Sequence, residues 1–123
     1  MNGVMGNSHA IPFSAHAVIE TVAGPAIMAA PFVFDFGQAA SIVAFAVGAL
    51  LLGLAIQAAG PSRTIPLAAH AGFEYMLAGA AALGGLIVGF ATGEWGATSF
   101  LVGVGVAQVA LTTATRFSAP LGA

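Results

Sequence analysis

Four long apolar stretches, separated by short breaks rich in glycine and polar residues, restrict what this chain can fold into. A transmembrane helix needs about 20 consecutive, mostly apolar residues. The sequence predicts such helices at residues 12–34, 38–59, 66–90 and 95–115. A transmembrane β-barrel would instead need segments of about 10 residues with alternating polarity, and this alternation is absent. We therefore expect an all-α membrane protein, with four transmembrane helices arranged as two helical hairpins.

The chain carries too little charge for a soluble domain. Only 5% of its 123 residues are charged and 59% are hydrophobic, whereas about 25% charged residues is usual in soluble domains. We expect a single membrane domain over residues 1–123. Two basic residues cannot form a phosphate-binding patch, which excludes nucleic acid as a partner. Nucleotide-binding and nucleophile motifs are also absent, so we predict no catalytic residues and no enzyme unless a metal or haem is bound.

A repeated decapeptide indicates an internal duplication. IPFSAHAVIE at residues 11–20 returns 54 residues later as IPLAAHAGFE, with six of ten positions identical. The repeats are expected over residues 11–60 and 65–117. Two helices per unit make the repeats parallel, related by a pseudo-two-fold axis along the membrane normal. In the second helices, Phe45, Val47 and Gly48 align with Phe100, Val102 and Gly103 once one residue is inserted.

Each repeat carries a His-x-x-x-Glu step, formed by His16 and Glu20 and by His70 and Glu74. Residues four apart share one helix face. At 1.5 Å per residue, the two histidines lie roughly 6 Å and the two glutamates roughly 12 Å inside the starts of their helices. Ionisable groups at such depth usually face the bundle interior. We expect a buried polar cluster on the shared axis, with Gln108 of the fourth helix at a similar depth.

Three interpretations of this cluster remain open. The pairs could be hydrogen-bonded groups that only hold the hairpins together. They could form a site for a proton, a cation or a divalent metal, and nitrogen and oxygen ligands from His16, Glu20, His70 and Glu74 would suit Zn, Mn or Fe. Alternatively, His16 and His70 could be the axial ligands of one haem.

The few remaining charges predict the topology. Arg63 lies between the hairpins and Arg116 follows the last helix, whereas Asp35 and Glu94 lie in the opposite loops. The positive-inside rule then places both termini in the cytoplasm, with the protein in the inner membrane. The two arginines would meet lipid headgroups.

Proline and glycine distinguish the first and third helices. Pro25 and Pro31 are expected to kink the first helix, because proline removes a backbone donor. Gly85, Gly89 and Gly93 recur at four-residue spacing in the third, which lets another helix pack closely. That partner is either inside the bundle or a second copy of the chain.

Residues 30–36 (APFVFDF), followed by the small-residue helix segment 44–48 (AFAVG), resemble the SPW-repeat family of small bacterial membrane proteins. The preceding Ala15-His16 and Glu20 step is also similar to members of that family. In the second repeat, Gly84-Gly85-Leu86 stands in place of the Pro-aromatic step. The resemblance implies a multi-span bacterial membrane protein and no particular activity.

Two function classes follow from these features. The first is a structural or accessory subunit that associates with itself or with a larger membrane complex, as short loops and small-residue faces suggest. The second is a minimal transporter or channel with Glu20 and Glu74 as its proton- or cation-binding pair. Four helices rich in Ala and Gly leave little lumen, so a transport pathway would need an oligomer.

Overall fold

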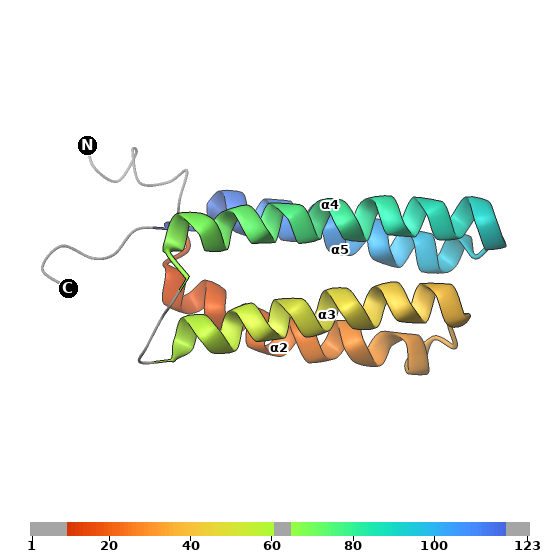
Figure 1. Ribbon diagram of the computed structural model, residues 1–123, viewed down its shortest axis with the longest axis horizontal. Helices are drawn as coiled ribbons and strands as arrows, with labels where there is room; N and C mark the ends of the chain where they lie inside the picture. Colours follow the sequence, from red (N-terminus) through yellow and green to blue (C-terminus); the bar gives the residue numbers. More distant parts are fainter. Residues whose placement is uncertain (1–9, 61–64, 118–123) are drawn as a thin grey trace, which may run out of the picture.

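The computed structural model describes residues 10–60 and 65–117, and these residues form four long helices (Figure 1). All four are long and apolar enough to cross a membrane. The predicted all-α, multi-pass membrane protein is confirmed to this extent, and every predicted helix boundary agrees within two residues. The helices are α2 (Phe13–Val33), α3 (Gln38–Ala59), α4 (Leu67–Thr92) and α5 (Trp95–Ala114).

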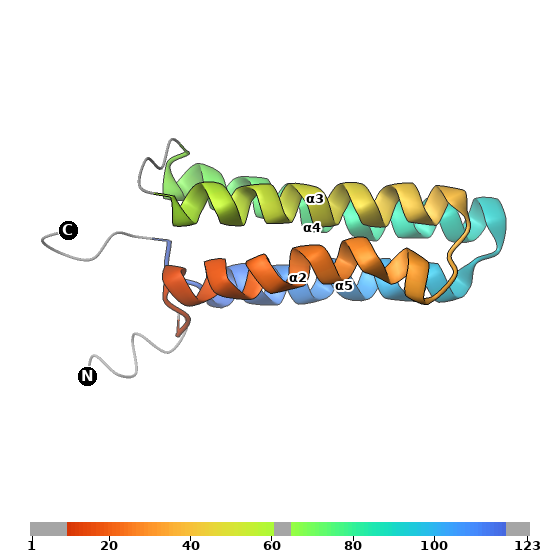
Figure 2. The same cartoon turned by 90° about the horizontal axis from the view of Figure 1, so that it is seen from below.

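The helices form two antiparallel hairpins that lie side by side. α2 packs along α3, and α4 packs along α5 (Figures 1 and 2). The hairpins meet chiefly through α3 and α4. The start of α2 and the end of α5 therefore lie at one end of the bundle, and the two hairpin loops lie at the other.

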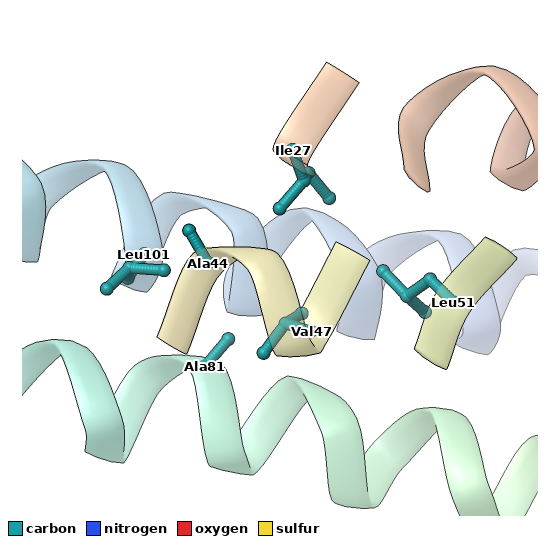
Figure 3. Packing of buried hydrophobic residues seen from close by; sticks show 6 residues of the cluster. All are labelled: Ile27, Ala44, Val47, Leu51, Ala81 and Leu101. Carbon is teal, nitrogen blue, oxygen red and sulfur yellow. The ribbon is translucent and has the colours of Figure 1, made fainter. Parts of the chain in front are cut away.

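Small and branched side chains fill the interior, and the largest apolar side chains point outward. Phe32, Met76 and Phe90 are 78%, 70% and 80% exposed. Lipid solvates such groups, so helices in a membrane gain by packing small residues closely against each other. The main core cluster draws on all four helices (Figure 3) and contains Ile27, Ala44, Val47, Leu51, Ala81 and Leu101.

Glycines set the closest approach within each hairpin. A Cβ on Gly48 would lie 2.6 Å from the carbonyl oxygen of Gly24, and a Cβ on Gly105 would lie 2.7 Å from that of Ala78. The predicted alignment of Gly48 with Gly103 is not followed by the packing, because Gly103 is exposed and has no neighbouring atoms within 4 Å of a Cβ. The packing counterpart of Gly48 is Gly105.

The buried face of α5 therefore follows that of α3 at a spacing of 57 residues rather than 55. The reason is that α4 has 26 residues and α2 has 21, so α5 begins 28 residues after the start of α4, whereas α3 begins 25 residues after the start of α2. The buried pairs at this spacing are Ala40/Ala97, Ala44/Leu101, Gly48/Gly105, Leu51/Gln108, Ala55/Thr112 and Ala58/Thr115.

The other special residues have distinct roles. α2 continues through Pro25 and Pro31 without interruption. Gly85 and Gly89 face Thr98 and other residues of α5, so this part of the glycine stripe packs within the bundle. Gly93 does not belong to the packing face. It ends α4 in the left-handed conformation, with φ of 77°, which glycine adopts without steric cost.

The two hairpin loops are joined by a side chain. Glu94, immediately before α5, accepts a hydrogen bond from the backbone N–H of Gly37 at 2.8 Å. Gly37 caps the start of α3, and a carboxylate is favoured near the positive end of a helix dipole. Asp35, in the same loop, has a left-handed φ of 55°.

The glycine contact between α2 and α3 predicts a difference between two substitutions on one helix. Gly48→Ala should lower the free energy of unfolding by about 1–3 kcal/mol, because the new methyl group meets the backbone of α2. Gly53→Ala is the matched control, since a Cβ there meets no atom within 4 Å, and should change stability by less than about 1 kcal/mol. Thermal unfolding in detergent measures both, and equal effects would contradict the packing.

Candidate functional site

The structure brings both His-x-x-x-Glu steps into one buried cluster. His16 and Glu20 extend from α2, His70 and Glu74 from α4, and Gln108 from α5. The two glutamates and His16 are 0% exposed and His70 is 1% exposed. The repeat places each pair on one helix face, and the packing turns the two faces toward each other. Below, this group of five residues is called the polar cluster.

The contacts within the polar cluster cross between α2 and α4. His16 Nε2 lies 2.8 Å from Glu74 Oε2 and 3.2 Å from Glu20 Oε2. His70 Nε2 lies 2.6 Å from Glu74 Oε2 and 3.7 Å from Glu20 Oε1. Each imidazole therefore faces carboxylate oxygens from both hairpins, and Glu74 Oε2 is shared by the two rings.

α5 supplies hydrogen-bond donors to both carboxylates. The amide nitrogen of Gln108 donates to Glu20 Oε2 at 2.8 Å and also to Glu74 Oε1. The Thr112 hydroxyl donates to Glu74 Oε1 at 3.1 Å. One oxygen of each glutamate is thus held by α5, and the other oxygen is left toward the imidazoles.

Two threonines of this site were missed in the sequence. Thr112 and Thr115 follow Gln108 at positions i+4 and i+7, which lie on one helix face. That spacing was a usable signal. It is weak in isolation, because threonines in transmembrane helices often satisfy their hydroxyl within their own helix, as Thr21 does with the carbonyl of Ala17.

Thr115 fixes the hydrogen-bonding state of one imidazole. Its hydroxyl donates to the carbonyl oxygen of Leu111 at 2.6 Å, so its oxygen must accept from His16 Nδ1, which lies 2.8 Å away. A neutral imidazole has one N–H and one acceptor nitrogen. In the neutral ring, Nε2 of His16 therefore turns a lone pair toward the carboxylate oxygens of Glu20 and Glu74.

Aromatic rings cover the polar cluster at the terminal end of the bundle. Phe13 stacks on His16 with ring centroids 5.8 Å apart and meets His70 edge-on at 5.1 Å. Phe117 contacts the same two rings at 5.2 and 6.0 Å. Backbone hydrogen bonds between Ile11 and the residues around Thr115 hold the cover in place.

One acceptor in the polar cluster has no donor. Among the described residues, Glu20 Oε1 is fully buried and receives no hydrogen bond. An unsatisfied buried acceptor costs about 1–3 kcal/mol, and more when the group is charged. His70 Nε2 lies 3.7 Å from it, beyond hydrogen-bonding distance.

The polar cluster offers imidazole nitrogens and carboxylate oxygens as possible metal ligands. The ligand atoms of the two histidines and two glutamates all lie within 4.8 Å of one another. A haem between His16 and His70 would have to displace Glu74, whose Oε2 contacts both rings.

Arg116 is exposed at the same end of the bundle, and Arg63 lies outside the described residues.

No family model, curated protein or solved structure matches this chain. The resemblance to the SPW-repeat family therefore stays a prediction, and the interpretation of the site depends on its own geometry.

The contacts predict that the two glutamates are not equivalent. Glu74→Met removes the carboxylate partner of His16 and His70 and the acceptor of Gln108 and Thr112, and should lower the free energy of unfolding by about 3–5 kcal/mol, as when a buried pair loses one partner. Glu20→Met is the matched control, because Glu20 is equally buried but makes fewer contacts, and should cost less. Unfolding in detergent compares the two, and a larger loss for Glu20→Met would contradict this ranking.

Proposed function

We propose that this protein is a structural or accessory subunit of a bacterial inner membrane, built to associate with itself or with a larger membrane complex. The observation that carries the proposal is the polar cluster, which connects α2 to α4 and α5 inside an otherwise apolar bundle. The described segments between helices within each hairpin are short, at residues 34–37 and 93–94. Most of the described chain is thus committed to the membrane.

Contacts within the polar cluster stabilise the association of the two hairpins. An unpaired polar group in the hydrocarbon region costs several kcal/mol, so a separated α2–α3 hairpin would leave His16 and Glu20 without their cross-hairpin partners. The Glu94–Gly37 hydrogen bond adds a second link at the loop end. A stable bundle with apolar outer faces is a suitable subunit for assembly in the membrane.

The duplication fits this role. The decapeptide repeat and the recurrence of buried positions at 57 residues support two parallel repeats about a pseudo-two-fold axis. Such an axis would run between the two hairpins, with the polar cluster on it at the terminal end of the bundle, where both copies of His-x-x-x-Glu can contribute. The positions of Arg116 at one end and of Asp35 and Glu94 at the other support cytoplasmic termini.

A face of α4 and α5 supports self-association. A shallow groove between these helices is lined by Gly79, Ala82, Val106 and Ala110, with Tyr75 at one end. Small side chains on a lipid-facing surface permit close helix contact. We propose that a second copy of the chain occupies this groove, since each copy presents the same exposed apolar faces to its neighbours in the membrane.

The oligomeric state tests the assembly. Gly79→Leu should fill the groove and shift the protein toward the monomer, measured by native mass spectrometry from detergent. Gly72→Leu is the control on the same helix, since both glycines have no atoms within 4 Å of a Cβ and only Gly79 lines the groove. A parent protein that is monomeric at every concentration would count against self-association.

A second candidate function is a proton- or cation-coupled transporter. The unpartnered Glu20 Oε1 favours it, because a buried acceptor without a donor suits a group that binds and releases a cation. The core between the polar cluster and the loop end is apolar in the described residues, with Ile27, Ala44 and Leu101 among its members. Transport would therefore need a pathway between copies.

Flux measurements separate the two functions. For a transporter, the parent protein in liposomes should carry protons or cations, and the double substitution of Glu20→Gln and Glu74→Gln should abolish flux while the protein still folds. Glu94→Gln serves as the control, because Glu94 lies at the opposite end of the bundle. Absence of flux in the parent protein would rule out transport by this chain alone.

A further inference from the structure

We propose that the polar cluster is a binding site for one divalent transition metal ion, with Zn²⁺ as the best fit. The ligands are His16 Nε2, His70 Nε2, Glu20 Oε1 and Glu74 Oε2. This inference does not depend on the proposed assembly or transport function. It assigns the cluster a ligand, whichever role the protein has.

The first reason is the mismatch between facing atoms. Thr115 directs the N–H of His16 away from the cluster, so in the neutral ring Nε2 presents a lone pair. That lone pair faces Glu74 Oε2 at 2.8 Å and Glu20 Oε2 at 3.2 Å. Carboxylate oxygens are also acceptors. A cation among these atoms, either a proton on Nε2 or a metal ion, satisfies acceptors on both sides at once.

The second reason is that the two oxygens of each glutamate have different partners. Gln108 binds Glu20 Oε2 and Glu74 Oε1, so one oxygen of each glutamate is already held. Of the other two, Glu74 Oε2 lies between the imidazoles and Glu20 Oε1 has no hydrogen-bond partner among the described residues. These are the oxygens that remain for a cation, one from each hairpin.

The third reason is size. Zn²⁺ binds His nitrogen and carboxylate oxygen at about 2.0–2.2 Å in a tetrahedron, which places ligand atoms about 3.3–3.5 Å apart by the same geometry. The described contacts between imidazole nitrogens and carboxylate oxygens run from 2.6 to 3.7 Å. The ligand atoms of the four residues all lie within 4.8 Å of one another, so side-chain shifts on the order of 1 Å would complete the coordination.

The surroundings also suit a metal. Ligating histidines usually donate their second ring N–H to an oxygen, which fixes the tautomer and the ring orientation. For His16, the Thr115 hydroxyl oxygen is the acceptor of this second ring N–H. The glutamates are oriented by Gln108 and Thr112, and the rings of Phe13 and Phe117 exclude water from the histidines. Cysteine is absent from the chain, so the donors are nitrogen and oxygen alone.

Zinc titration of the full chain tests the proposal. The protein, purified in detergent and treated with a chelator, should bind one Zn²⁺ per chain, measured by competition with a chromophoric chelator. Zinc should also raise its melting temperature, because an ion that binds only the folded state stabilises it. X-ray absorption should show four nitrogen or oxygen ligands at about 2.0–2.1 Å, two of them from imidazole.

Matched variants locate the site. His70→Ala and Glu20→Gln should each weaken zinc affinity by at least about 100-fold, because each removes a ligand. His9→Ala is the control, since His9 is the third histidine of the sequence and belongs to neither His-x-x-x-Glu step. It should leave zinc affinity unchanged. Thr115→Val should keep the stoichiometry but weaken affinity by about 10–100-fold, as expected for a residue that only positions a ligand.

Two results would overturn the proposal. One is a folded, chelator-treated parent protein whose melting temperature and zinc content do not respond to added zinc. The cluster would then be held by protons alone. The other is zinc binding that disappears in His9→Ala and persists in His70→Ala, which would place the metal outside the cluster. Measurements on the parent protein remain decisive even if a ligand variant does not fold.

Discussion

The bundle depends on one carboxylate that three helices share. Glu74 of α4 meets His16 of α2 across the hairpin boundary, His70 on its own helix, and Gln108 and Thr112 of α5. In a hydrocarbon environment, apolar side chains are solvated equally well by lipid and by each other. Directional contacts therefore select this arrangement of hairpins from the many that would pack comparably.

Glycines at the helix contacts let the backbones within each hairpin pack closely together. Gly24 and Gly48 bring α2 and α3 together, and Gly105 meets the backbone of α4. The close approach of α5 to α4 at Gly105 shortens the distance that Gln108 and Thr112 must reach to Glu74. The glycine contacts thus pack each hairpin tightly, and the polar cluster then joins the two hairpins through short hydrogen bonds and ion pairs.

The four helices and the members of the polar cluster could be predicted from the sequence, because length, hydropathy and a repeated His-x-x-x-Glu are strong signals. The register of α5 could not. Gly103 and Gly105 are equally plausible in a glycine-rich helix, and only the extra length of α4 decides between them. Thr115 was missed because its role depends on a contact with a residue 99 positions away. Gly93 matched a packing stripe by spacing but ends its helix instead.

The two halves of the bundle contribute unequally to the cluster. At matching buried positions, α5 and its C-terminal cap offer Gln108, Thr112 and Thr115, where α3 has Leu51, Ala55 and Ala58. Hydrogen-bond partners of the first helix therefore come from the end of the chain: Gln108 donates to Glu20, 88 residues earlier, and Thr115 accepts from His16, 99 residues earlier. It follows for biosynthesis that α2 enters the bilayer with its polar groups unmatched, and that only insertion of the final helix makes the first one fully compatible with the membrane.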